Sequence, residues 1–134
     1  MFEILFLGTS ASAPSAHRGL SSHIVSHNEY RFLVDCGEGT QRQILQSSKG
    51  FKRLTRALLT HGHLDHIGAL PWLLKEINPV LYATPFTRAL INKMLAEKSE
   101  LKPKLKEYKP GKAFDLGHFH IDTIQVNHSI PDAV

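Results

Sequence analysis

The residues best suited to chemistry lie in the segment His61-Gly62-His63-Leu64-Asp65-His66, where three imidazoles and one carboxylate fall within six positions. A neutral imidazole is a good zinc ligand, and a carboxylate offsets part of the charge of a cation. In an extended or turning backbone His61 and His63 point to the same side, whereas Asp65 and His66 follow the turn and can face a second ion. The spacing therefore predicts a two-metal site.

Two residues far from this segment are candidates to work with it. His128 follows the segment 124–127, which is expected to be the end of a strand, and Pro131 constrains the turn behind it. That position suits a further metal ligand. Asp35 closes another expected strand just before a glycine turn. It can accept a hydrogen bond from a metal-bound histidine and so set its tautomer, or it can simply be an Asx-turn residue.

The remaining histidines and the single cysteine are expected to be structural. They have no paired base, acid or imidazole in the sequence around them: His17, His23, His27, His118, His120 and Cys36. A single cysteine forms no internal disulfide, which favours a reducing compartment.

Composition bounds the class of protein. The 134 residues are 42% hydrophobic, which is ordinary for a globular chain, and we expect a single domain over 1–134. The sequence contains no apolar run of about 20 residues and no leader-like N-terminus, so it predicts a cytoplasmic protein without a membrane partner. The formal net charge of +4 favours anionic partners only mildly.

Several β-type runs and three helical segments should position these side chains. The expected strands are 3–7, 20–25, 30–34, 54–60, 80–83, 101–109, 112–116 and 119–126. The segment 26–29 is expected to join two of them as a four-residue hairpin connection. The expected helices are 40–47, 69–76 with Pro71 in its first turn, and one that begins at Thr84-Pro85 and carries an apolar stripe to Leu95.

This pattern of hairpin strands followed by alternating strands and helices predicts an α/β architecture, a mixed sheet covered by helices. The segment 61–66 would then lie at the C-terminal end of a strand, where open sheets usually place ligands. Three lysines, Lys102, Lys104 and Lys106, would share one face of a late strand. They can guard a sheet edge or meet the phosphates of RNA, and both readings stay open.

The segment His61–His66 resembles the His-x-His-x-Asp-His signature of the metallo-β-lactamase fold superfamily of metal-dependent hydrolases. The resemblance implies an αββα sandwich of which this chain is the N-terminal half, with two Zn²⁺ ions, although such sites also accept manganese or iron. It implies that His61, His63 and His128 hold one ion and that Asp65 and His66 hold the other. It also favours the hydrogen-bonding role of Asp35.

Two portions resemble ribonucleases of that superfamily. Residues 6–18 and 33–41 are similar to the start of ribonuclease Z, the tRNA 3′-processing endonuclease, and residues 58–134 are similar to the catalytic core of ribonuclease J. The resemblance implies hydrolysis of RNA phosphodiester bonds by a water that two metal ions activate, with Asp65 as metal ligand and as the group that orients the water or accepts its proton.

The same resemblance implies that a second half, absent from this chain, supplies a bridging aspartate and a last histidine. RNA is the expected partner, and the complete enzyme is expected to be a homo-oligomer. Two other functions stay open: a thioester or lactam hydrolase of the same superfamily, and a non-catalytic fragment that binds metal or RNA. The flanking glycine, proline and serine motifs favour the ribonuclease.

Overall fold

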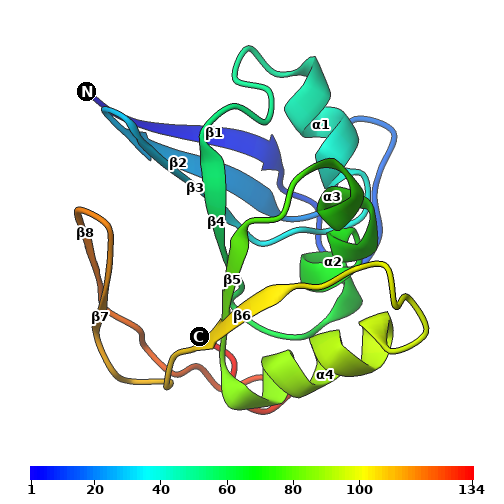
Figure 1. Cartoon of the computed structure of the whole chain (residues 1–134), viewed down its shortest axis with the longest axis vertical. Helices are drawn as coiled ribbons and strands as arrows, with labels where there is room; N and C mark the ends of the chain where they lie inside the picture. Colours follow the sequence, from blue (N-terminus) through cyan, green and yellow to red (C-terminus); the bar gives the residue numbers. More distant parts are fainter.

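Twelve elements form the chain, and the computed structural model describes all of residues 1–134 (Figure 1). In order they are β1 (Phe2–Gly8), β2 (Ser22–His27), β3 (Tyr30–Val34), α1 (Thr40–Gln46), β4 (Leu54–Leu58), α2 (Leu64–Ile67), α3 (Leu70–Glu76), β5 (Val80–Ala83), α4 (Pro85–Leu95), β6 (Lys104–Glu107), β7 (Phe114–Leu116) and β8 (Phe119–Ile121).

Six strands form one mixed sheet in the order β1-β2-β3-β4-β5-β6. The pairs β1–β2 and β2–β3 are antiparallel, and from β3 onward each strand runs parallel to its neighbour. Parallel neighbours need a crossover, and the segments containing α1, α2 with α3, and α4 provide them. The helices lie on one face of the sheet and the β7–β8 hairpin lies on the other (Figure 1). The predicted α/β class with a mixed sheet is confirmed.

The hairpin between β2 and β3 is tighter than predicted. His27 pairs with Tyr30, so the connection is two residues, Asn28 and Glu29, and the expected four-residue connection 26–29 is wrong. Asn28 has a positive φ of 53°, a conformation that asparagine adopts more readily than most residues. The strands therefore continue right up to the turn.

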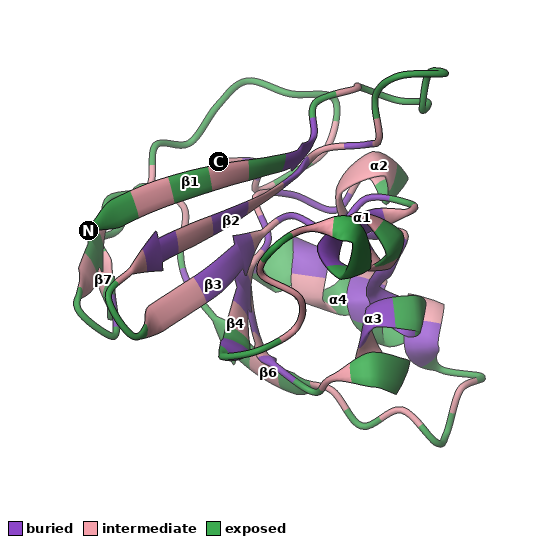
Figure 2. Cartoon of the chain, turned by 90° about the horizontal axis from the view of Figure 1, so that it is seen from above, coloured by how far each residue is buried: buried purple, intermediate pink, exposed green.

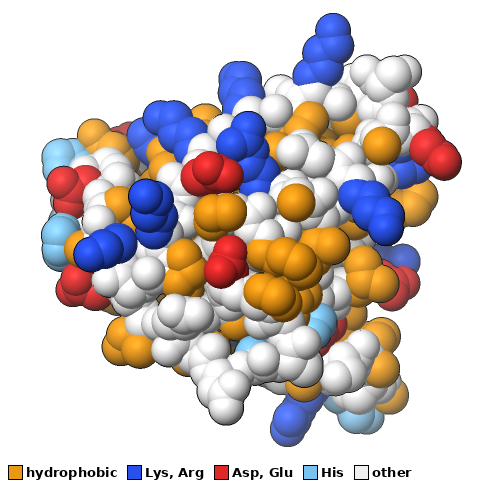
Figure 3. All heavy atoms as spheres, turned by 90° about the horizontal axis from the view of Figure 1, so that it is seen from below, with side chains coloured by type: hydrophobic (Ala, Val, Ile, Leu, Met, Phe, Trp, Pro, Cys, Tyr) orange, Lys and Arg blue, Asp and Glu red, His pale blue; other side chains and the backbone are white.

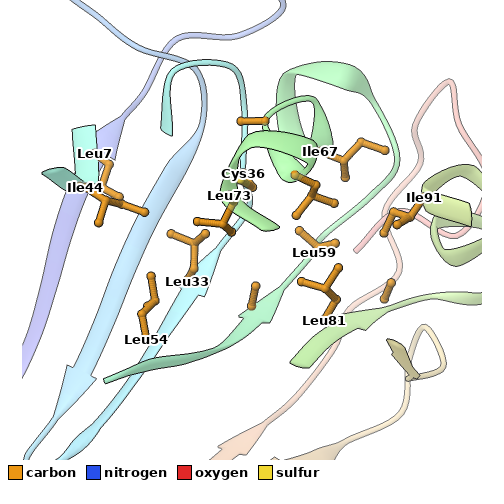
Figure 4. Close-up of a cluster of buried hydrophobic side chains, with 14 of the residues drawn as sticks. Leu7, Leu33, Cys36, Ile44, Leu54, Leu59, Ile67, Leu73, Leu81 and Ile91 are labelled. Atoms are coloured by element: carbon orange, nitrogen blue, oxygen red, sulfur yellow. The ribbon is translucent and has the colours of Figure 1, made fainter. Parts of the chain in front are cut away.

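The core lies between the sheet and its helices. The strand residues Leu33 and Leu81 point toward the helices, where Ile44 and Leu73 meet them (Figure 4), and Ile24 of β2 belongs to the same buried cluster. Burying one such aliphatic side chain contributes about 1.5–3 kcal/mol, so the period-two pattern of the strands determines which face the helices cover.

The opposite face of the sheet is only partly covered. Phe119 of the β7–β8 hairpin packs edge-on against Phe32, with ring centroids 5.0 Å apart. Farther along β1, Phe2, Ile4 and Phe6 remain exposed, and the alternation of exposed and half-buried residues is visible along that strand (Figure 2).

The last third of the chain has less strand than predicted. β6 spans only Lys104–Glu107, and β8 ends at Ile121, so no strand leads into His128. The strand expected over 119–126 is present only over 119–121, and its continuation to 126 is wrong, because β8 pairs only with the short β7. Instead the amide of Val126 donates to the carbonyl of Ala133 (3.0 Å), which closes the segment into a loop.

The edge strand β6 carries two of the three lysines discussed above. Lys104 and Lys106 are exposed, and the ammonium of Lys106 lies 5.9 Å from the ring centre of Tyr82 on β5. Lysine and arginine side chains are scattered around a central group of hydrophobic ones on the face shown in Figure 3. No helix is both long enough and apolar enough to cross a lipid bilayer.

Candidate metal centre

The segment 61–66 leaves the sheet at the C-terminal end of β4. His61 and His63 lie in the irregular stretch after β4, and Asp65 and His66 lie on the single turn of α2. The carbonyl of His63 accepts the amides of His66 (2.9 Å) and Ile67 (3.1 Å), which starts this turn. The short helix was not predicted, and it is what turns Asp65 and His66 back toward His61.

The structure brings together all five residues that the sequence proposed as ligands. Potential ligand atoms lie within 4.8 Å of one another in two groups: His61, His63 and His128, and His61, Asp65 and His66. His61 belongs to both, and its ring centre lies 3.9 Å from that of His66 and 4.7 Å from that of His128. His61 is therefore the centre of the cluster.

Asp35 forms hydrogen bonds with His66 and with Thr60, the residue before His61. It follows β3 with a positive φ of 60°, and its Oδ2 lies 2.7 Å from Nδ1 of His66. Its Oδ1 accepts the amide of Thr60 (2.8 Å), and the Thr60 hydroxyl also donates to the carboxylate (2.8 Å to Oδ2). Because an ionised carboxylate only accepts, Nδ1 of His66 is the donor and Nε2 keeps the lone pair that a metal needs.

The same network sets the tautomer of His61. The Thr60 hydroxyl has one proton, which it donates to Asp35, so it accepts from Nδ1 of His61 at 3.0 Å. Nε2 of His61 is then a bare lone pair, and it is buried without any hydrogen-bond partner. Leaving such an atom unpaired costs about 1–3 kcal/mol. A bound cation would satisfy it, so the residues present fit a metal ion.

The pKa values differ within the cluster. Burial, helped by the nearby His66, lowers the pKa of His61 to about 4, which keeps this imidazole neutral at physiological pH. Burial also acts to lower the pKa of His66, but the hydrogen bond and charge of Asp35 outweigh it and raise that pKa. Burial opposes ionisation of Asp65, yet the Ser12 amide and His66 lower its pKa. The site thus combines a neutral imidazole, that of His61, with a carboxylate, that of Asp65, whose ionised form is favoured.

His128 reaches the cluster on a fastened loop. The Ser129 amide donates to Nδ1 of His128 (2.8 Å), which places the proton of the neutral ring on Nε2, so Nε2 binds a metal only after this proton is lost or moves to Nδ1. The amide of Val134 donates to the carbonyl of Thr60 (3.1 Å). Asp132 accepts the amide of Phe86 (3.1 Å) at the start of α4, where the hydroxyl of Thr84, the residue before the helix, donates to that of Thr87.

Three residues of the site were missed by sequence reasoning. Thr60 links Asp35 to His61, the amide of Ser12 donates to Oδ2 of Asp65 (2.9 Å), and the Ser129 hydroxyl lies 3.5 Å from Nε2 of His63. The hydroxyl that precedes His61 was the one visible signal, because a threonine next to a ligand can bond its ring nitrogen. Ser12 acts through its backbone, which no side-chain pattern reveals.

The histidines expected to be structural do not join either candidate group. One expectation about them is wrong, since His120 does have an acidic partner, Asp115, at 2.8 Å on the β7–β8 hairpin. Cys36 is buried, and burial, helped by Asp35, raises the pKa of its thiol. Its backbone has a definite role, because its amide donates to the carbonyl of His66 (2.7 Å) and its carbonyl accepts the amide of Ala69 (3.0 Å).

Comparisons with known proteins identify the family of this chain. The family model described as the metallo-beta-lactamase superfamily matches residues 18–126. Ribonuclease Z of Bradyrhizobium sp. (strain ORS 278) is 40% identical over 145 residues, covering 99% of this chain and 48% of the relative. Ribonuclease J of Mycoplasma pneumoniae is 33% identical over 128 residues, covering 86% of this chain and 22% of the relative.

Among solved structures, the short form of human tRNase Z matches with a TM-score of 0.68 and 34% identity, over 80% of this chain and 43% of that one. The similarity to ribonuclease Z thus extends over nearly all of the chain and beyond its N-terminal portion. The chain spans about half the length of the ribonuclease Z relatives it matches, and less of the ribonuclease J ones.

Proposed function

Because the chain belongs to the metallo-beta-lactamase superfamily, we propose that it forms the metal-binding part of a ribonuclease that hydrolyses phosphodiester bonds of RNA. The similarity to ribonuclease Z and ribonuclease J supports the substrate class. The single observation that most supports metal-dependent chemistry is the buried, unpartnered Nε2 of His61 at the centre of the histidine cluster. We further propose RNA as partner, a cytoplasmic location and a homo-oligomeric complete enzyme.

We propose Zn²⁺ as the metal, with His61, His63 and His128 holding one ion and Asp65 and His66 holding the other. Bound Zn²⁺ supplies Lewis acidity toward a phosphoryl oxygen and lowers the pKa of water. Imidazole nitrogens and one carboxylate oxygen are donors that zinc accepts readily. The shared position of His61 places the two groups of donors side by side.

The chain's own residues then have separate tasks. Asp35 and Thr60 hold His66 and His61 in the tautomers that present Nε2. Asp65, kept ionised by the Ser12 amide, can orient a water molecule or accept its proton. Ser129 contacts two of the ligands, His128 through its amide and His63 through its hydroxyl.

A chimera tests this proposal in a complete enzyme. Residues 1–134 replace the matching half of the Bradyrhizobium ribonuclease Z, and the product is assayed on precursor tRNA with a 3′ trailer. We expect cleavage that Asp65→Ala abolishes, while Asp115→Ala, on the exposed hairpin, leaves it unchanged. A chimera that folds and binds zinc but leaves the RNA intact, or an Asp65→Ala chimera that still cleaves, would contradict the proposal.

Two alternatives are separated by the same material. Parallel assays on a thioester and a β-lactam identify a different hydrolase of the superfamily. The isolated chain is also tested for binding of zinc and RNA. If it binds both tightly while the chimera cleaves nothing, a non-catalytic binding module is favoured.

A further inference from the structure

A cavity of about 600 Å³, lined mostly by polar residues and by none of the five candidate metal ligands, has no assigned role. Its volume falls in the range of about 300–1,000 Å³ that small-molecule sites occupy. The cavity is lined by the loop 14–19, by residues at the start of α1 and by Trp72 of α3. Two guanidinium groups, Arg18 and Arg42, line it, and neither forms an ion pair within the chain. One carboxylate, that of Glu38, lines the cavity as well, so the two guanidinium groups leave the lining with a net positive charge that favours an anionic ligand.

Trp72 is the one large aromatic side chain of this lining, in which Pro14 and Ala16 are the other apolar side chains. Its neighbours Leu70, Pro71 and Leu73 are buried in the core, whereas Trp72 is 54% exposed. The ammonium of Lys75 lies 4.9 Å from the centre of the indole ring. An exposed indole is a stacking surface for any nucleobase, and nearby cations suit the phosphate that accompanies the base.

Two of the segments that line the cavity contact Asp65, a candidate metal ligand. The loop that forms one wall is held by the amide of Ser12, which donates to Asp65 (2.9 Å). The segment before α1 packs on the same residue, because a Cβ on Gly37 would collide with the carbonyl oxygen of Asp65. Trp72 follows Asp65 by only seven positions, on the helix after α2. A nucleotide in the cavity would therefore adjoin the site of hydrolysis.

We propose that Trp72 stacks on an unpaired base of the RNA substrate while Arg18 and Arg42 contact its phosphate. This inference rests on the proposed function for the identity of the substrate, and it adds a specificity-determining residue. The site would select single-stranded nucleotides next to the bond that is cut, because a paired base cannot offer its face to the indole.

The test uses the fact that Trp72 is the only tryptophan of the chain, so intrinsic fluorescence reports on it alone. Metal-free protein is titrated with a short single-stranded oligoribonucleotide, with the same oligonucleotide made abasic, with a duplex, and with a free nucleoside monophosphate. We expect saturable quenching by the single strand, weak quenching by the free nucleotide, and little by the abasic strand or the duplex.

Variants are compared by the anisotropy of labelled RNA. Trp72→Leu should weaken binding of the single strand about 5- to 150-fold, and Trp72→Phe should retain most of it. Phe86→Leu, which alters an exposed aromatic residue outside the cavity, is the matched control and should change nothing. Circular dichroism and zinc content check that the variants fold.

Equal binding of the intact and abasic strands, or unchanged binding by Trp72→Leu, would overturn the proposal and leave only phosphate attraction. Because these measurements need neither metal nor cleavage, they are independent of the chimera assay. Stacking on Trp72 without cleavage by the chimera would support the RNA site and contradict the ribonuclease function. Cleavage by the chimera without stacking on Trp72 would support the ribonuclease function and contradict the RNA site.

Discussion

Two segments of the chain place a His-x-His pair among aspartates, residues 61–66 after β4 and residues 115–122 on the β7–β8 hairpin. In the first, His61 is buried, shares a hydrogen bond with Thr60 and has a pKa lowered to about 4 by burial. In the second, His120 is 65% exposed, and its hydrogen bond to Asp115 with the charge of Asp122 raises its pKa.

The difference shows what a metal site needs beyond ligand types. The hairpin has imidazoles and carboxylates close together, yet an exposed carboxylate pairs with the imidazole and favours its protonated form. At the metal centre the carboxylate of Asp35 bonds the ring nitrogen that points away from the cluster, and burial keeps His61 neutral. In both segments a carboxylate engages Nδ1 of one histidine and raises the pKa of that ring. The contrast therefore lies in the burial that lowers the pKa of His61 and leaves its Nε2 without a hydrogen-bond partner.

The largest expected effect comes from removing the shared ligand. His61→Ala should weaken zinc binding by more than about 100-fold, because loss of an outer hydrogen-bond partner alone costs about 10–100-fold. Isothermal titration of the metal-free chain measures this. His120→Ala is the matched control in the hairpin and should leave the affinity unchanged. A loss of equal size in both variants would erase the contrast between the two segments.

The next effect concerns the support of the ligands. Asp35→Asn should lower zinc affinity about 10–100-fold. The variant lacks the carboxylate that accepts the hydrogen bond from Nδ1 of His66, so the ring is no longer held with Nε2 available to the metal. Competition with a chromophoric chelator provides the measurement. Asp115→Asn makes the same change beside His120 and is the matched control. A drop in zinc affinity in this variant would show that Asp35 acts through the overall charge of the protein and not through its hydrogen bond to His66.

The third prediction concerns pH and separates the segments directly. In metal-free protein the His61 ring should remain neutral down to about pH 4, whereas His120 should titrate above the ordinary value. The unfolded chain binds a proton at His61 near pH 6.5, so this residue makes stability fall as pH drops from about 6.5 toward 4. His120 has the opposite sign, and its contribution is lost as pH rises through its folded pKa. The NMR signals of the histidine rings report the pKa values of both residues. Equal pKa values for His61 and His120 would contradict the comparison.

The smallest expected effect is that of the hydroxyl between the two networks. Thr60→Val removes the bonds to Asp35 and His61, and we expect a loss of about 0.5–1.5 kcal/mol in the free energy of unfolding of metal-free protein. Urea denaturation measures it. Thr55→Val, at an exposed position of β4, should change stability by less than about 0.5 kcal/mol. No loss in the Thr60 variant would mean that Asp35 alone orders the cluster.

Much of the fold could be predicted from local patterns. The strand 80–83 and the helix around 69–76 follow from apolar periodicity and from the place of Pro71 in the first helical turn. The C-terminal third was predicted less well, because 119–126 is β-like in composition while strand formation there depends on a pairing partner. The one-turn helix α2 is too short for a periodic signal.

The sequence by itself determined the kinds of ligand and their order in 61–66, because neighbours along a chain stay neighbours in any fold. It also marked His128 and Asp35 as candidates without bringing them near. Only the tertiary structure decided that a loop closed on Thr60 carries His128 to His61, and that Asp35 meets His66 across the end of the sheet. Those contacts join residues 31 to 74 positions apart, and the neutrality of His61 follows from burial, which is a property of the whole fold.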